Sequence, residues 1–199
     1  MQITAENLSC ERGGRTVFSN QNFALGSGEF LQLTGPNGSG KSSLLRLLAN
    51  LGEPSLGKIT LADGAPDLTL GQQAHYIAHS DASKSALTVT ENLIFWRDFL
   101  GGGDLQQALD AVNLSALADY PVALLSAGQK RRLALARLAL VSRAIWLLDE
   151  PSVGLDDASQ KLLVALMNQH LKAGGLVVAA THVPLGAKHH KNLHLGGQA

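Results

Sequence analysis

The 199-residue sequence has few or none of the features that define several large classes of protein. Cys10 is its only cysteine, so an internal disulfide bond and a cysteine metal cluster are both excluded. Its 16 basic side chains are matched by 16 acidic ones, whereas a protein that binds a nucleic-acid backbone usually has a basic excess. No segment approaches the ~18 charge-free apolar residues of a membrane helix, since Arg137 and Arg143 interrupt the longest candidate, 133–148. The sequence therefore predicts neither a nucleic-acid partner nor a membrane span.

What the sequence does contain is enough apolar material for one sizeable core. Hydrophobic residues make up 45% of the chain and charged residues 16%, which is the balance of a folded domain rather than a disordered one. Residues 1–6 lack the basic start and the apolar run of a secretory signal. We expect a soluble, cytoplasmic protein whose residues 1–199 form a single domain.

The alternation of strand and helix patterns predicts an α/β fold with a mainly parallel sheet. Strands are expected at 3–8, 21–25, 30–33, 58–61, 74–78, 144–148 and 175–180. Helices are expected from 44, from about 127, and near 156–172. Between about 84 and 126 the pattern is mostly helical, with Thr90 and Asp104 as the expected N-caps. We interpret this segment as a small inserted helical subdomain.

The strongest local signal is a glycine-rich loop between an expected strand and an expected helix. The run Gly35-Pro36-Asn37-Gly38-Ser39-Gly40-Lys41-Ser42 satisfies G-x-x-x-x-G-K-S, a pattern whose backbone N–H groups cradle phosphates. Lys41 is expected to reach the β- and γ-phosphates, Ser42 to ligate Mg²⁺, and Ser43 to contact the α-phosphate region. The loop predicts a nucleoside-triphosphate site but leaves the class of NTPase open.

Two carboxylates follow the strand expected at 144–148. Asp149 would stand at the carboxyl edge of the sheet beside the phosphate loop, where it can contact Mg²⁺ through water. Glu150 comes next, and alternation along an extended chain would turn it to the other face, toward the attacking water as general base. The pair is a weak signal alone, but the phosphate loop upstream makes it a strong one.

The segment Leu125-Ser126-Ala127-Gly128-Gln129 indicates the class of ATPase. It resembles the signature of ATP-binding-cassette proteins, usually Leu-Ser-Gly-Gly-Gln, with Ala127 in place of the first glycine. The resemblance implies a P-loop NTPase (RecA-like) core with an N-terminal antiparallel β subdomain. It also implies a homodimer in which Ser126, Ala127, Gly128 and Gln129 contact the γ-phosphate held by the opposite subunit. An ordinary N-cap at Ser126 is the simpler alternative, which explains the serine but leaves Gly128 and Gln129 unexplained.

Two shorter segments resemble further parts of the same family. Ser152-Val153-Gly154-Leu155-Asp156 is similar to the loop after the catalytic glutamate, where Asp156 would communicate across the dimer. Thr181-His182 follows the expected strand 175–180 and resembles the switch histidine, which implies a contact from His182 to the γ-phosphate. The resemblance thus implies a catalytic set of Glu150, His182 and Lys41, with ATP and Mg²⁺ as the bound species.

Two positions depart from the family pattern. His79 stands where the family usually has a glutamine that senses Mg²⁺ and touches the membrane partner, so metal contact and partner contact are both open for it. Arg12 stands near the place of the aromatic residue that stacks on adenine, and a planar guanidinium can stack on a base. Phe18 is a second candidate for that stacking, although a place in the core is the simpler expectation.

Several runs narrow the resemblance to one branch of the family. Residues 10–12, His79, 87–93, 125–132 and 180–185 look like the ATP-binding subunits of the cytochrome c maturation, or haem-export, system. That resemblance implies a peripheral subunit on the cytoplasmic face of a bacterial inner membrane, bound to integral membrane subunits. Its ATPase would power haem export or the release of a haem-loaded carrier. The subunit would meet haem only indirectly, because it needs no haem ligand of its own.

Other functions remain as alternatives. The chain could serve another ABC transporter, or act as a soluble regulatory ABC ATPase with weak turnover, which the residues at His79 and Ala127 favour. A soluble family member that acts on ribosomes or DNA usually has two cassettes or a long coiled-coil insertion, and the sequence has neither. A P-loop kinase has no signature segment.

Two clusters of basic or titratable residues have simpler interpretations than a binding site. His189, His190 and His194 are expected in a solvated tail rather than in a metal site. The run Lys130-Arg131-Arg132 follows the signature, and we expect it on an exposed helix face, with some of its residues at the dimer seam.

Overall fold

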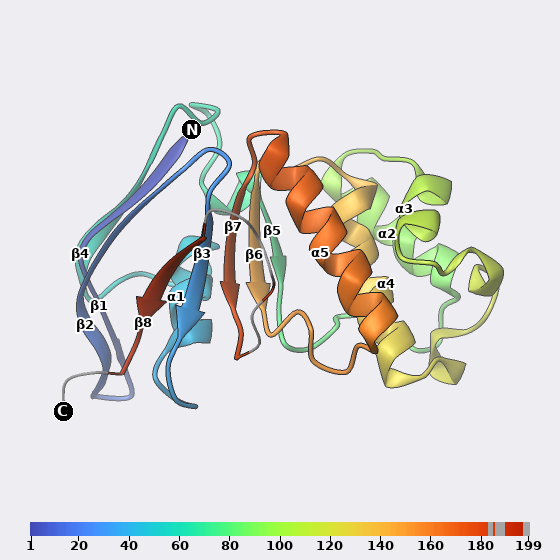
Figure 1. Cartoon of the computed structure of the whole chain (residues 1–199), viewed down its shortest axis with the longest axis horizontal. Coiled ribbons are helices and arrows are strands. Elements are labelled where there is room, and N and C mark those ends of the chain that lie inside the picture. Colours follow the sequence, from blue (N-terminus) through green and yellow to red (C-terminus); the bar gives the residue numbers. More distant parts are fainter. Residues whose placement is uncertain (183–184, 186–189, 197–199) are drawn as a thin grey trace.

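The computed structural model describes residues 1–182, 185 and 190–196. An antiparallel sheet lies at one end of the molecule, a parallel sheet in the middle, and a group of helices at the other end (Figure 1). The strands are β1 (Gln2–Arg12), β2 (Arg15–Gly26), β3 (Phe30–Thr34), β4 (Leu56–Ala62), β5 (Ala74–Ile77), β6 (Ile145–Asp149), β7 (Leu176–Ala180) and β8 (His190–His194). The α-helices are α1 (Lys41–Leu48), α2 (Val89–Leu100), α3 (Leu105–Ala111), α4 (Ala127–Leu140) and α5 (Asp157–Lys172).

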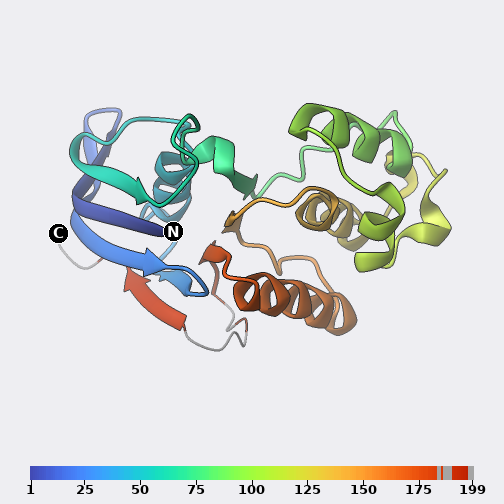
Figure 2. The ribbon, with the colours of Figure 1, turned by 90° about the horizontal axis from the view of Figure 1, so that it is seen from above.

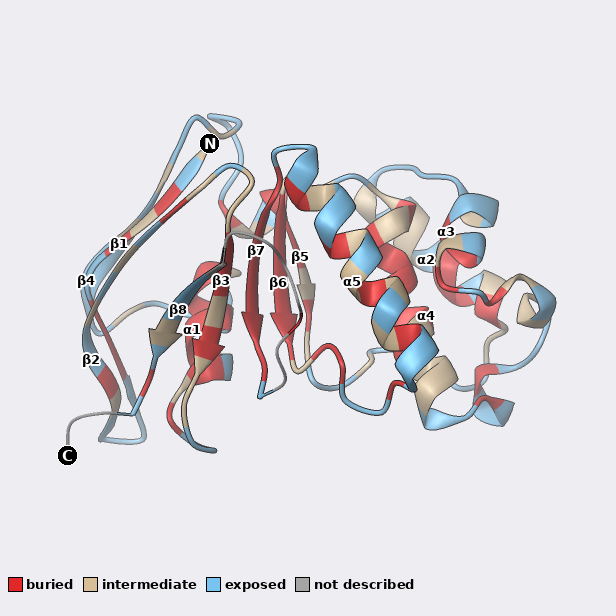
Figure 3. Ribbon diagram, viewed as in Figure 1, coloured by how far each residue is buried: buried red, intermediate tan, exposed pale blue. Residues whose placement is uncertain are grey.

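The central sheet is parallel throughout the described residues, with the strand order β5-β6-β7-β3-β8. Every residue of β6 and β7 is buried, which Figure 3 shows as two continuous red strands. Strands covered on both faces read as unbroken apolar runs, and both were predicted from such runs. The α/β class with a mainly parallel sheet is confirmed.

The antiparallel sheet has the order β2-β1-β4 and packs through α1 onto the central sheet. Figure 2 shows α1 between the two sheets. The apolar face of α1, Leu44, Leu45 and Leu48, is fully buried in the cluster that joins them. β1 and β2 are longer than the predicted strands because one hairpin pairs Gln2 with Gly26 and continues, with bulges, to Arg12 and Arg15.

Helices α2 and α3 pack on α4 around a second buried cluster. Asp104 caps α3, as predicted, since its side chain accepts a hydrogen bond from the Gln107 N–H. The predicted cap at Thr90 is wrong. Thr88 has the extended backbone of an N-cap and forms a capping box with Glu91, so α2 begins two residues earlier. No helix among these described residues is both long and apolar enough to cross a bilayer.

Two of the three C-terminal histidines, His190 and His194, lie in a strand and not in a tail. His190–His194 form β8, which pairs in parallel with β3 at the edge of the central sheet. The ring Nδ1 of His194 lies 3.2 Å from Thr34 Oγ1, and the next residue, Leu195, is fully buried. Four polar residues and one leucine have no clear strand pattern, so the pairing with β3 decided the structure here. His189 lies outside the described residues.

A buried histidine in the central sheet makes stability depend on pH. His75 of β5 is 3% exposed and donates its Nε2–H to the Val141 carbonyl at 2.7 Å. Burial lowers the pKa of His75 from 6.5 to about 4. The unfolded chain therefore takes up the proton first as the pH falls, so the stabilisation is complete above pH 6.5 and is lost toward pH 4. His170 contributes with the same sign, because burial also lowers its pKa.

We expect the free energy of unfolding to fall by roughly 3 kcal/mol between pH 6.5 and pH 4 because of His75. Urea unfolding at half-unit steps of pH measures the slope. The variant His75→Phe should flatten that slope, whereas His194→Asn, on the sheet edge, should not. An unchanged slope in His75→Phe would contradict the assignment.

Candidate active site

The phosphate loop joins β3 to the start of α1, in the context that its sequence predicts. Gly40 is the N-cap of α1 and has a left-handed backbone (φ 98°). A Cβ on Gly40 would lie 2.6 Å from Val17 Cγ1 and 2.8 Å from Phe18 Cδ1, so both the backbone and the packing require glycine. No side chain caps α1, which leaves its first N–H groups available to an anion. Phe18 is buried in the core beneath this glycine.

The Lys41 side chain lies folded against the phosphate loop itself. Lys41 is 8% exposed, and its Nζ donates to the carbonyls of Gly35 at 2.8 Å and Pro36 at 3.1 Å. These two carbonyls hold the ammonium group beside the loop before any ligand is present. A phosphate in the loop would then meet a cation that is already partly desolvated, which strengthens their attraction.

A cleft of about 450 Å³ opens beside the loop and gathers most of the predicted site residues. The predicted residues on its wall are Arg12, Asn37, Gly38, Gly40, Lys41, Ser42, Ser43, His79, Asp149 and Glu150. Three predicted ATP-binding residues, Gly35, Pro36 and Ser39, are not on the wall. The carbonyls of Gly35 and Pro36 instead accept the hydrogen bonds of Lys41. The cleft thus joins segments from four regions of the sequence.

The backbone at Glu150 differs from the extended chain that was expected. Asp149 ends β6 as a buried residue, but Glu150 has a left-handed conformation with φ 46°. Its N–H donates to the Ala180 carbonyl at 2.9 Å. Strand alternation therefore does not explain where the Glu150 side chain points. The turn explains it, because a left-handed residue redirects the chain at the carboxyl edge of the sheet.

The side chain of Glu150 lies near that of His182, which follows β7. Glu150 Oε1 is 3.4 Å from His182 Nε2, with 17% of the glutamate side chain and 53% of the histidine side chain exposed. The adjacent parallel strands β6 and β7 end together, so residues 32 positions apart in the sequence meet at one edge. A carboxylate and an imidazole at this distance can share a proton or orient a common water.

The donors in the cleft suit a hard divalent cation. Two residues on the cleft wall carry such donors. Asp149, a residue that is 5% exposed, offers a carboxylate, and the exposed residue Ser42 offers a hydroxyl. Oxygen donors of this kind are the ones that Mg²⁺ prefers, and the buried carboxylate gains from a nearby positive charge. His79 supplies a nitrogen, which suits Mg²⁺ less well. Across the described residues there is no group of three or more His, Cys, Asp or Glu arranged to hold a metal.

The signature segment begins helix α4. Ser126 is the N-cap, and its Oγ accepts from the Gln129 N–H at 3.2 Å while the Gln129 side chain accepts from the Ser126 N–H at 2.8 Å. This capping box accounts for Gln129 as well as the serine, so the argument that an ordinary cap leaves Gln129 unexplained is wrong. Gly128 has a separate reason: a Cβ there would lie 2.9 Å from the Gly154 carbonyl.

A polar pocket of about 330 Å³ surrounds this helix start. Its wall includes Ser126, Gly128, Gln129, Gly154 and Asp156. Asp156 caps α5 through a hydrogen bond to the Ser159 N–H at 2.8 Å, and this bonding to Ser159 lowers the pKa of the Asp156 carboxyl. The pocket shares no residue with the phosphate cleft. Within one chain, the two groups of predicted ATP contacts are therefore in different places.

The basic run after the signature does not form an exposed face. Arg131 is 4% exposed, and Lys130 and Arg132 are half-buried. Arg131 makes hydrogen bonds to the segments after β5 and β6. The signal that was missed is its spacing: Arg131 lies four residues before Leu135 and seven before Leu138, which places it on the buried side of α4.

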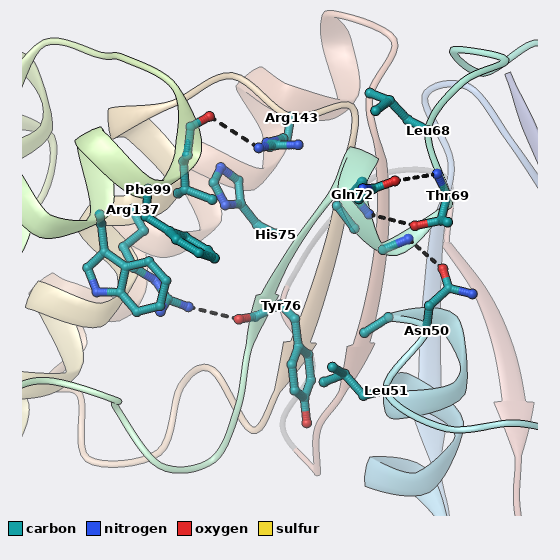
Figure 4. Close-up of a pocket in the computed structure, with 15 residues that line it drawn as sticks. Asn50, Leu51, Leu68, Thr69, Gln72, His75, Tyr76, Phe99, Arg137 and Arg143 are labelled. Carbon is teal, nitrogen blue, oxygen red and sulfur yellow. Dashed lines mark hydrogen bonds between the residues drawn. The ribbon is translucent and has the colours of Figure 1, made fainter.

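A larger groove of about 910 Å³ lies between the central sheet and α2 (Figure 4). One wall carries the exposed leucines Leu51 and Leu68, and the other carries Phe99, whose residue is 70% exposed. Arg137 crosses the floor, donates to the Tyr76 carbonyl at 2.8 Å and lies 4.0 Å from the centre of the Trp96 ring. Burial lowers the pKa of Arg137 to about 10, which still leaves it charged at pH 7.

Solved structures that superpose on this chain include ATP-binding cassettes. The chain superposes with a TM-score of 0.82 on a putative ABC transporter ATP-binding protein from Pyrococcus furiosus, at 22% identity, covering 97% of this chain and 98% of the other. A dimeric ATP-binding cassette in a post-hydrolysis state with ADP and phosphate gives a TM-score of 0.80 at 24% identity, covering 97% and 94%. At these identities the likeness establishes the fold, so the expected P-loop NTPase architecture is confirmed.

Sequence comparisons reach further. The profile of the ABC transporter family matches residues 18–153. The cytochrome c biogenesis ATP-binding export protein CcmA of Nitrobacter winogradskyi is 53% identical over 201 residues, covering 100% of both chains. The protein of the same name from Rhodopseudomonas palustris is 53% identical over 188 residues, covering 94% of both. The chain therefore belongs to the ABC transporter family as a nucleotide-binding ATPase, and within that family to the cytochrome c biogenesis ATP-binding export proteins.

Proposed function

We propose that this chain is the ATP-hydrolysing subunit of a membrane complex that powers haem export or the release of a haem-loaded carrier in cytochrome c assembly. Identity of 53% over the whole length to proteins named for that process supports the proposal. Residues 1–199 would form one nucleotide-binding domain with a helical subdomain at about 84–126. The subunit would sit on the cytoplasmic face of a bacterial inner membrane as a peripheral component.

The catalytic part of the proposal rests on one observation: the phosphate cleft and the signature pocket are separate in a single chain. A second copy arranged head to tail would bring Ser126 of one chain to the γ-phosphate held by Lys41 of the other. If the two copies are related by a two-fold axis, each contact occurs twice, so the dimer contains two such sites. The N-terminus of α4 would then lie against the γ-phosphate, and its positive potential would stabilise the negative charge there.

Hydrolysis would proceed by in-line attack of water on the γ-phosphate. Glu150 would accept the proton of that water. His182, whose Nε2 lies 3.4 Å from Glu150 Oε1, would contact the γ-phosphate. Lys41 and the opposing signature helix would offset the charge that develops on the phosphate oxygens. Ser42 and Asp149 would hold Mg²⁺, which supplies further charge neutralisation on the β- and γ-phosphates when bound. Arg12 would stack on the base at the mouth of the cleft.

We place the membrane partner in the groove of Figure 4. Both walls of the groove are apolar. Two basic side chains also line it, Arg137 at the floor and Arg143 near the rim. A short amphipathic helix with a carboxylate on its polar side matches this combination of surfaces. His79 would then lie between partner and nucleotide, since it follows β5, which also lines the groove.

Co-purification from bacterial membranes tests the proposal. We expect the tagged chain to carry integral membrane subunits and a haem-containing carrier, and ATP to release the carrier. The variant Phe99→Asp should weaken membrane association by about tenfold or more, because an exposed aromatic anchor is lost, while ATP hydrolysis by the free subunit stays intact. Leu56→Asp is the matched control, since Leu56 is 69% exposed on β4 and outside the groove. Recovery with ribosomes or DNA instead of membrane proteins would contradict the proposal.

A further inference from the structure

Arg131 of α4 makes two hydrogen bonds to the segment that carries His79. Its Nη1 donates to the Ala78 carbonyl at 2.9 Å and to Asp81 Oδ1 at 2.9 Å. These two acceptors lie on either side of His79, which lines the phosphate cleft. The ion pair with Asp81 is largely shielded from water, because 5% of the arginine side chain and 26% of the aspartate side chain are exposed.

The same guanidinium makes three hydrogen bonds to the turn after β6. Nη2 donates to the carbonyls of Asp149 and Glu150, both at 2.8 Å, and Nε donates to the Pro151 carbonyl at 3.3 Å. All of these acceptors are main-chain atoms, so Arg131 fixes the backbone of the turn rather than its side chains. The guanidinium has five N–H donors, and five acceptors surround it.

The turn at Glu150 needs such support. A left-handed backbone at a residue other than glycine is strained, and it persists only where the surroundings hold it. Ala180 accepts from the Glu150 N–H on one side, and Arg131 donates to the Glu150 carbonyl on the other. Both ends of the residue are therefore held, and the orientation of its carboxylate toward the cleft depends on both.

Arg131 also lies five residues after Ser126 on the same helix. A displacement of the signature helix would therefore move the donors that hold the Glu150 turn and the His79 segment. A lysine could not replace these contacts, because its ammonium group is a single point with three donors, whereas the planar guanidinium reaches separate segments at fixed angles.

We propose that Arg131 is a positioning residue for hydrolysis. It holds the main chain of Glu150 and of the His79 segment in the working geometry and links both to the signature helix. The inference rests on the proposed role of Glu150 as general base. A displacement of about 1 Å at a reacting group can reduce a rate by about 10²-fold, so loss of this clamp affects turnover more than nucleotide binding.

The test compares Arg131→Gln and Arg131→Lys with the wild type. For both variants we expect kcat to fall by about 30- to 100-fold while KM for ATP stays within about threefold. Arg97→Gln is the control, since Arg97 on α2 pairs with its neighbour Asp98 at the surface. Asp81→Ala removes one of the five acceptors at a partly exposed position, so it should fold normally and lower kcat by about fivefold.

A double-mutant cycle separates positioning from a general loss of structure. In single-turnover assays, Arg131→Gln added to Glu150→Gln should lower the rate by less than about threefold, because the clamp acts through a general base that is already absent. If the rate reductions of Arg131→Gln and Glu150→Gln multiply in full in the double variant, the inference is overturned. A wild-type kcat in folded Arg131→Lys and Asp81→Ala would also overturn it. A wild-type chain without ATPase activity would instead sink the proposed function, which keeps the two failures distinct.

Discussion

Glu150→Gln is expected to bind ATP and to hydrolyse it about 10²- to 10⁴-fold more slowly than the wild type. The amide has the shape of the carboxylate and can still bond to His182, but it cannot accept a proton from water at neutral pH. The left-handed turn is held through main-chain atoms, so the substitution leaves it in place. Single-turnover hydrolysis of labelled ATP measures the rate, and size-exclusion chromatography with ATP should show an accumulated dimer.

The control for this variant is Glu53→Gln, which neutralises an exposed carboxylate outside the cleft. It should hydrolyse ATP at the wild-type rate. If Glu150→Gln kept more than a tenth of wild-type turnover, Glu150 would not be the general base. If the wild type were as slow as the variant, the regulatory alternative with weak catalysis would be favoured.

Two inactive variants are expected to regain activity when they are mixed. Lys41→Ala removes the phosphate-loop cation. Ser126→Asp keeps an N-cap on α4, because aspartate caps helices as well as serine does, but places a negative charge against the γ-phosphate of the opposite chain. Each variant alone should lose about 10²-fold in rate. In a mixed dimer, the wild-type loop of one chain faces the wild-type signature of the other, so one of its two sites is intact.

Random pairing of equal amounts makes half of the dimers mixed, so about a quarter of the sites in the whole mixture should work. Co-expression with two different tags and purification over both isolates the mixed dimer, in which about half of the sites should work in a single-turnover assay. Ser126→Asn is the matched comparison, since it caps the helix without the charge and should lose less activity than Ser126→Asp. A mixture no more active than its components would refute the head-to-tail site.

Several parts of this fold could be predicted because they depend on short stretches of sequence. The phosphate loop requires glycine at Gly40 and a cation at Lys41, and both requirements are visible in eight residues. Strands β6 and β7 are apolar throughout, since both of their faces are covered. Local capping is also written in the sequence, although Thr88 rather than Thr90 provided the cap of α2 because Glu91 completes its capping box.

Other features depend on contacts between distant segments, and the sequence alone did not reveal them. β8 has little strand character, and pairing with β3 makes it a strand. Arg131 has the composition of a surface residue, but carbonyls from two loops about 20 and 50 positions away surround it. Glu150 was expected in an extended chain, whereas hydrogen bonds to Ala180 and Arg131 stabilise a turn.

The sequence by itself determined the chemistry: a phosphate loop, two carboxylates after an apolar strand, and a serine-led helix start, each set by neighbours within a few residues. Only the tertiary structure decided how these pieces are distributed, with Lys41, Asp149 and Glu150 on one cleft and Ser126 on a separate pocket. The physical reason is the sequence distance over which each kind of interaction acts. Backbone geometry and capping act over one turn of chain, whereas a cleft forms where a parallel sheet brings the ends of distant strands to one edge.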